Sequence, residues 1–180
     1  MCDPTSDPEQ LVLFDPLTDA TGTWSGPSAW QFGADSITKD LRPVGIAEIS
    51  REIAPLAYPS IEATLTYTPD PGLFVGVAFD VAGERVKCYV SIDTAGAQHA
   101  YLYIGADQRK GTDVTGTGPV HLTLTQLRDN TYRCRVRRDN ETAIELGDTR
   151  VVAGTAARLI VLVESTMIEV TSIVLWTTTT

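Results

Sequence analysis

The fold is decided by five segments that alternate apolar and polar residues, namely FVGVAFDV (74–81), VKCYVSID (86–93), HAYLYIG (99–105), VHLTLTQL (120–127) and YRCRVRRD (132–139). Alternation with a period of two buries one face of a strand and leaves the other face in water, as in antiparallel sheets. Linkers rich in Gly, Asp, Asn and Thr separate the segments and are typical of turns. This stretch predicts a set of antiparallel β-strands.

The same alternation extends to both sides of the central stretch. It occurs in GIAEISREI (45–53), IEATLTY (61–67) and MIEVTSIVLW (167–176), and a shorter strand is expected at LVLF (11–14). No window has the apolar spacing of a helix over three turns, and we expect at most a short helical turn near residues 53–58. About a dozen short strands with frequent turns predict an all-β sandwich of two packed antiparallel sheets.

Length and charge limit the classes of protein to consider. A chain of 180 residues with 43% hydrophobic content predicts one domain, with residues 1–10 as a flexible tether and residues 11–180 as the sandwich. The net charge of −9 repels nucleic acid and anionic lipid surfaces. The longest aliphatic run, LIVLV (159–163), is far shorter than the roughly 20 residues of a membrane-spanning helix, so no transmembrane segment is expected.

The first residues, MCDPTSDPEQ, place a cysteine at position 2 ahead of a polar tether. This pattern is typical of a mature bacterial lipoprotein, in which Cys2 carries the lipid anchor and Met1 replaces a removed leader. The alternative is a native disordered terminus with an incidental cysteine. The first interpretation predicts a protein of the bacterial cell envelope, or an extracellular one.

Cys88 and Cys134 both occupy inward-facing positions of their strands. An even pair of cysteines is typical of a disulfide in an oxidising compartment. In a single meander their strands would be three places apart, so their Cα atoms would be roughly 14 Å apart, which is too far for a disulfide. A disulfide therefore requires strands on facing sheets, and two buried free thiols are the alternative.

The order of segments resembles a known family. A leading LFDPL strand (13–17), IEATLTY (61–67), VGVAFDV (75–81), an R-x-x-N-E-T hairpin (137–142) and a final IEVTSIVLW (168–176) follow one another. This order resembles the concanavalin A-like, laminin G-like jelly-roll domains over residues 11–176. The resemblance implies a jelly-roll sandwich that binds glycans, serves in adhesion or hydrolyses glucans.

The catalytic signature of the glucanases in that superfamily is missing. Those enzymes carry a Glu-x-Asp-x-x-Glu strand in which two carboxyl groups about 5 Å apart attack and protonate the glycosidic bond. This sequence contains no Glu-x-Asp pair, and it also lacks the G-x-S-x-G, C-x-x-C and H-E-x-x-H patterns. We therefore expect a non-catalytic, lectin-like member of the superfamily that binds a glycan or another surface macromolecule.

Outward positions of the central strands supply the candidate binding residues. Tyrosine rings stack on the C–H faces of sugars, and histidine and arginine donate hydrogen bonds to hydroxyl groups. The candidate ligand-binding residues, if their strands share one concave sheet, are Tyr89, His99, Tyr101, Tyr103, His121, Arg133 and Arg135. The alternative is that cross-strand Tyr and Arg pairs only stabilise the sheet surface, as part of a structural or protein-interaction module.

Two further features have a mainly structural interpretation. Trp24, Trp30 and Trp176 are expected to pack against the sandwich rather than to bind ligand. Asp15, Asp19 and Glu169 stand near the first and last strands, where jelly-roll relatives hold a structural calcium ion through carboxylate oxygens. No EF-hand spacing accompanies them, and no other cofactor is expected.

Overall fold

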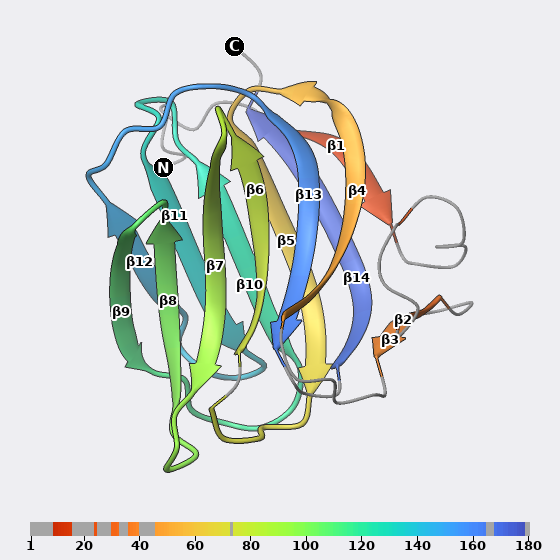
Figure 1. Ribbon diagram of the computed structural model, residues 1–180, viewed down its shortest axis with the longest axis vertical. Coiled ribbons are helices and arrows are strands. Elements are labelled where there is room, and N and C mark those ends of the chain that lie inside the picture. Colours follow the sequence, from red (N-terminus) through yellow and green to blue (C-terminus); the bar gives the residue numbers. More distant parts are fainter. Residues whose placement is uncertain are drawn as a thin grey trace, which may run out of the picture.

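Two antiparallel sheets lie face to face in the computed structural model (Figure 1). Among the residues that it describes there are strands and no helix, so none that could span a membrane. The structure describes residues 9–15, 24, 30–32, 36–39, 46–72, 74–164 and 168–178. The predicted two-sheet sandwich is confirmed.

The six-stranded sheet has the order β4-β13-β6-β7-β8-β9 and lies in front in Figure 1. Its strands are β4 (Ile46–Leu56), β13 (Ala156–Glu164), β6 (Phe74–Val81), β7 (Glu84–Ile92), β8 (Gln98–Ile104) and β9 (Asp107–Asp113). Strands β6 to β9 form a meander, in which each strand pairs with the next along the chain.

The eight-stranded sheet lies behind it, with the order β12-β11-β10-β5-β14-β3-β2 and with β1 also paired to β14. Its strands are β12 (Ile144–Asp148), β11 (Tyr132–Arg138), β10 (Val120–Gln126), β5 (Pro59–Tyr67), β14 (Ile168–Thr178), β3 (Ile37–Lys39), β2 (Trp30–Phe32) and β1 (Glu9–Asp15). The first and last strands of the chain therefore pair with each other, and β1 begins at Glu9 rather than at Leu11.

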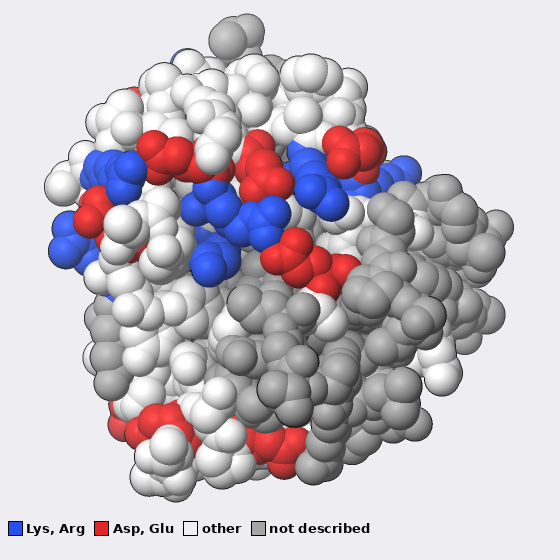
Figure 2. Space-filling view, in the orientation of Figure 1, with Lys and Arg blue, Asp and Glu red and all other residues white. Residues whose placement is uncertain are grey.

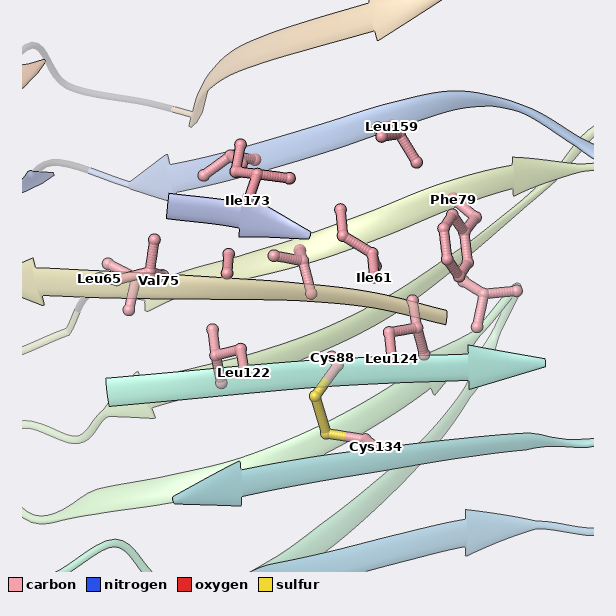
Figure 3. Close-up of a cluster of buried hydrophobic side chains, with 14 of the residues drawn as sticks. Ile61, Leu65, Val75, Phe79, Cys88, Leu122, Leu124, Cys134, Leu159 and Ile173 are labelled. Atoms are coloured by element: carbon pink, nitrogen blue, oxygen red, sulfur yellow. A yellow bond between two sulfur atoms is a disulfide. The ribbon is translucent and has the colours of Figure 1, made fainter. Parts of the chain in front are cut away.

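The core fills the space between the sheets with the inward residues of the alternating strands. Along β11 the residues are alternately buried and exposed, as the sequence pattern predicts. Trp24, expected to pack, is 5% exposed and belongs to this core. The largest fully buried side chains are Tyr132, Phe79, Ile37, Ile49, Ile61, Leu65, Ile92, Leu102, Ile104 and Leu122, several of which appear in Figure 3.

A disulfide between Cys88 and Cys134 crosses the core (Figure 3). Cys88 lies on β7 of the six-stranded sheet and Cys134 on β11 of the eight-stranded sheet, with their Cα atoms 5.2 Å apart. The two cysteines thus lie on facing sheets, which is the arrangement that a bridge requires, and the alternative of two free thiols is wrong. Both residues are fully buried.

One predicted local element is wrong. The helical turn expected near residues 53–58 is extended chain, because β4 continues to Leu56. Among the described strands, β4 is an edge strand that pairs only with β13, so Pro55 removes no hydrogen bond from a second neighbour. Tyr58 then reverses the chain direction with a φ of 51°, and β5 begins at Pro59.

Candidate functional site

A strip of tyrosine side chains lies on the outer face of the six-stranded sheet. Tyr89 on β7 is the cross-strand neighbour of Tyr101 on β8, and Tyr103 on β8 lies opposite Lys87. The intervening residue of β8, Leu102, is fully buried in the core, so the strand alternation turns the tyrosines outward. We call Tyr89, Tyr101 and Tyr103 the tyrosine strip.

Ring contacts hold the strip in place. The rings of Tyr89 and Tyr101 are stacked, with centroids 5.1 Å apart and an interplanar angle of 13°. Phe74 packs against the other side of Tyr89 at 5.5 Å and 57°. The ammonium group of Lys87 lies 4.2 Å from the ring centroid of Tyr103. Tyr89 is therefore enclosed between two rings, whereas Tyr101 has only one ring partner among the described residues.

The hydroxyl groups of the strip differ in their partners. The Gln108 side-chain amide donates a hydrogen bond to the hydroxyl of Tyr89. Burial raises the pKa of Tyr89, so its hydroxyl stays protonated in neutral solution and can donate to a ligand. Among the described residues, the hydroxyls of Tyr101 and Tyr103 have no hydrogen-bond partner. The strip thus offers both apolar ring surface and free polar groups.

Beside the strip, the floor of the sheet is made of small residues. Gly76 on β6 pairs with Tyr89, and a Cβ atom at Gly76 would lie 2.5 Å from the Cβ of Tyr89 and 2.7 Å from the carbonyl oxygen of Cys88. A Cβ atom does not approach other heavy atoms this closely, so any side chain here displaces β7. Ala78, the next outward residue of β6, is fully buried.

The Gly76→Ala variant is expected to displace Tyr89 and to lower the free energy of unfolding by about 2 kcal/mol, because overpacking of this kind costs about 1–3 kcal/mol. Urea denaturation measures the loss. Gly147→Ala on β12 is the matched control, because the nearest atom to a Cβ there is 4.0 Å away. Equal stability of the two variants would show that Gly76 does not set the position of the strip.

Ion pairs border the strip at the start of β7, and Figure 2 shows blue and red residues alternating in a band across this face. Arg85 binds both Asp80, with Nε 2.8 Å from Oδ1, and Glu48. Arg158 binds Glu52 at 3.3 Å. These pairs are about one-third exposed or more, so each contributes little to stability. Their effect is to fix charged groups at the edge of the strip.

Asp80 is the one carboxylate on the outward positions of β6, β7 and β8. Its two oxygens accept hydrogen bonds from Arg85, at 2.8 Å from Nε and 3.1 Å from the terminal nitrogen. Retaining glycosidases need two carboxyl groups about 5–5.5 Å apart on either side of the sugar linkage. The three central strands carry no such pair.

His99 does not join the strip, although its position in the strand alternation is the same. Its side chain is 11% exposed and lies between two carboxylates, with Nδ1 2.8 Å from Asp113 and Nε2 3.4 Å from Asp93. Asp93 also accepts hydrogen bonds from the backbone of Ala95 and Ala97. His99 therefore contacts the β7–β8 loop through Asp93 and lies apart from the strip, and its role in ligand binding stays a prediction.

His121, Arg133 and Arg135 lie on the opposite side of the molecule from the tyrosine strip. They belong to β10 and β11 of the eight-stranded sheet and point outward from it. The assumption of one shared concave sheet is therefore wrong, because the chain crosses between the sheets after β9. We call the outward residues Arg133, Arg135 and Arg137 the arginine row.

One arginine of β11 is buried, and the sequence pattern alone did not single it out. Arg138 is 6% exposed and donates hydrogen bonds to the hydroxyl of Tyr67 at 2.9 Å, to the side-chain oxygen of Gln98 at 2.8 Å and to the carbonyl of Gly118. Gln98 belongs to the six-stranded sheet, so this network joins the two sheets. A charged residue on the inward side of YRCRVRRD is the signal that could have revealed it.

A hollow of about 790 Å³ lies between the edge strands β9 and β12. Three acidic residues line it, and each contacts a different side chain. These pairs are Asp113 with His99, Glu141 with Thr115, and Glu145 with Arg135. The carboxylates of this hollow are thus engaged by neighbours within the protein.

The predicted calcium site cannot be assembled from the described residues. Asp19 and the side chain of Asp15 lie outside them, and the side chain of Glu169 is exposed on β14. In the described part of the chain, no group of three His, Cys, Asp or Glu residues is arranged to hold a metal ion. Calcium binding stays a prediction.

Comparisons with known proteins match the fold and not the sequence. No family model and no curated protein matches the chain. The structure of the CBM2 module of Lactobacillus casei BL23 phage J-1 evolved Dit is similar, with a TM-score of 0.66, 8% identity and coverage of 95% of this chain and 96% of that one. SCLam, a family GH16 non-specific endo-β-1,3(4)-glucanase, gives a TM-score of 0.68 at 10% identity and coverage of 98% and 95%.

A third similar structure is the legume lectin-like domain from Entamoeba histolytica, with a TM-score of 0.63, 9% identity and coverage of 86% of this chain and 90% of that one. Identities this low show the fold alone. The chain has the jelly-roll sandwich fold of these structures, as the order of its segments predicted.

Proposed function

We propose that this domain is a non-catalytic carbohydrate-binding module that holds a glycan against the tyrosine strip. The observation that carries the proposal is the pair of half-buried tyrosines, Tyr101 and Tyr103, whose hydroxyls have no hydrogen-bond partner among the described residues. An aromatic ring with a free polar group is the combination that sugars need, because their C–H faces stack while their hydroxyls form hydrogen bonds.

The surroundings of the strip support this function. Lys87 and Gln108 place nitrogen donors beside the rings, at a spacing fixed by cross-strand pairing. Burial, together with repulsion from Arg85, lowers the pKa of Lys87. Similar structures include a CBM2 module and a legume lectin-like domain, which supports a binding role on the same type of scaffold.

The lack of a catalytic carboxylate pair on the outward positions of β6, β7 and β8 supports a binding role over hydrolysis. Asp80 is held by Arg85 on both oxygens, and the sequence contains no Glu-x-Asp motif. A hydrolase would require an ionised nucleophile and a second carboxyl group that delivers a proton across the glycosidic bond. The outward positions of β6, β7 and β8 provide neither in an unpaired form.

The place of action proposed is the bacterial cell envelope or the extracellular space, with Cys2 as the lipid anchor. The buried disulfide between Cys88 and Cys134 supports an oxidising compartment, because cytosolic proteins keep their thiols reduced. Mass spectrometry of the protein from its native cells tests the anchor, since a diacylglyceryl group on Cys2 adds a defined mass.

The alternative function is a protein-interaction or structural module with no glycan ligand. Stacking between Tyr89 and Tyr101 favours it, because rings that contact each other already stabilise the sheet surface. The two functions make different demands on Tyr101 and Tyr103. Glycan binding requires their rings and hydroxyl groups, whereas the stability of the sheet does not require their hydroxyl groups.

The Tyr101→Ala/Tyr103→Ala variant is expected to bind a glycan about thirtyfold more weakly, because two aromatic contacts of about 1 kcal/mol each are lost. A glycan array that includes β-1,3- and mixed β-1,3/1,4-glucans selects the ligand, and isothermal titration calorimetry measures the loss. Arg133→Ala, on the opposite sheet, is the control and should leave this binding unchanged. Unchanged binding by the tyrosine variant would remove the strip as the site.

A further inference from the structure

The outer face of the eight-stranded sheet carries a second hollow, of about 160 Å³. It lies over β5, β10 and β11, on the far side of the sandwich from the tyrosine strip. The residues that line it are Glu62, His121, Thr123, Arg135 and Arg137. We propose that this hollow binds the carboxylate or sulfate group of an acidic sugar unit.

The arginine row gives this face its positive charge. The chain has only 14 Lys and Arg residues against 23 Asp and Glu, yet three arginines stand outward at alternate positions of β11. Residues two apart on a strand lie roughly 6.6 Å from each other, so these like charges repel. Such a concentration of positive charge on an acidic protein favours the binding of an anion.

The neighbouring strands neutralise only one member of the row. Arg135 lies opposite Glu145 on β12 and forms an ion pair with it at 3.5 Å. Arg133 lies opposite Gly147, and the β11–β12 pairing ends before it reaches Arg137. Among the described residues, Arg137 has no ion pair and no hydrogen bond. Its five N–H donors are therefore available at the hollow.

His121 forms a wall of the hollow and is held by the protein itself. Its Nε2 lies 2.8 Å from Oδ1 of Asp139, and its Nδ1 lies 3.2 Å from Oγ1 of Thr64. Ser172 in turn donates to Oγ1 of Thr64 at 3.1 Å. Both ring nitrogens are occupied, so His121 shapes the hollow and leaves the binding of an anion to Arg135 and Arg137.

The lining fits an anionic group attached to a hydroxylated ring. The Glu62 carboxylate offsets one of the two guanidinium charges in the lining, and Arg135 also pairs with Glu145. Arg137 therefore supplies the charge that a single carboxylate or sulfate neutralises. Glu62 repels a bare anion but accepts hydrogen bonds from sugar hydroxyls, and Thr123 can donate or accept. The volume is well below the roughly 300 Å³ of small-molecule pockets, so the hollow takes the anionic group of one sugar unit rather than a longer oligosaccharide.

Isothermal titration calorimetry with glucuronic acid, glucose 6-sulfate, glucose and inorganic sulfate tests the proposal. Glucuronic acid or glucose 6-sulfate is expected to bind, and the stronger of the two identifies the anionic group. Glucose should bind at least about tenfold more weakly, because it lacks the charge-assisted hydrogen bonds. Equal affinity for glucose overturns the proposal, because the negative charge then contributes nothing to binding. Equal affinity for inorganic sulfate alone also overturns it, because the sugar ring then contributes nothing.

Two variants of the arginine row locate the site. Arg137→Ala is expected to weaken binding of the acidic sugar about tenfold. Arg133→Ala removes the same charge from the same face but does not line the hollow, so it should weaken binding less than about threefold. Equal losses in both variants overturn the proposal in favour of general electrostatic attraction.

The proposal is independent of the function assigned to the tyrosine strip. Binding of the acidic sugar should persist in the Tyr101→Ala/Tyr103→Ala variant, and binding of the neutral glucan should persist in Arg137→Ala. Loss of acidic-sugar binding in the tyrosine variant overturns the second site and places both ligands on the strip. Circular dichroism of each variant confirms that the fold is intact before binding is compared.

Discussion

Replacing Cys88 and Cys134 together by alanine is expected to lower the free energy of unfolding by about 4 kcal/mol. The disulfide joins residues with a sequence separation of 46. A cross-link across a loop of this length lowers the entropy of the unfolded chain, which stabilises the folded state by about 4 kcal/mol. Domains of this kind are stable by only about 5–15 kcal/mol, so the variant approaches the limit of folding. Denaturation in urea measures the change.

Reduction of the unaltered protein provides the control. Because both cysteines are fully buried, a reductant should act only after unfolding and then give the stability of the double variant. The double variant itself should not respond to the reductant. If the double variant is as stable as the parent to within about 1 kcal/mol, the disulfide does not lower the entropy of the unfolded chain by the expected amount.

Replacing Arg138 by alanine is expected to cost about 3 kcal/mol of stability. The change removes a buried group whose hydrogen bonds reach Tyr67, Gln98 and the carbonyl of Gly118, and it leaves those groups without this donor. Burial raises the pKa of Tyr67 and the charge of Arg138 opposes that increase, so the pKa of Tyr67 should rise further in the variant.

Two comparisons separate the possible causes of that loss. Arg138→Met keeps most of the side-chain volume and removes the hydrogen bonds, so it reports on the polar network alone. Arg137→Ala, at the adjacent exposed position, should change the stability by less than about 0.5 kcal/mol. If the two alanine variants are equally stable, the network of Arg138 does not contribute to the joining of the sheets.

The direction of side chains could be predicted from the sequence, because it follows from the alternation alone. Ile61, Ala63 and Leu65 read as inward and are fully buried, and Tyr89 and Tyr101 read as outward and form the strip. The turns also followed from local chemistry, since Gly83 and Gly96 adopt the positive φ angles that favour glycine. Both features depend on residues that are adjacent in the sequence.

The assignment of strands to sheets could not be predicted, since alternation is the same on either sheet. For this reason the candidate residues of β7 and β8 were grouped with those of β10 and β11, which face the other way. Strand β9, with the sequence DQRKGTD, falls in a linker between two of the alternating segments, because it has no apolar residue to alternate. It is an edge strand, and its charged side chains are compatible with that position.

The disulfide also determines how a mechanical load would pass through the domain. Cys88 is flanked by Lys87 and Tyr89 on one outer surface, and Cys134 is flanked by Arg133 and Arg135 on the other. Apart from the disulfide, the two sheets are held together mainly by apolar packing. Such packing is non-directional, so it offers little resistance when one sheet slides along the other. A pulling force on one outer surface would therefore reach the opposite surface through a covalent bond. At the disulfide the two sheets would resist sliding past each other.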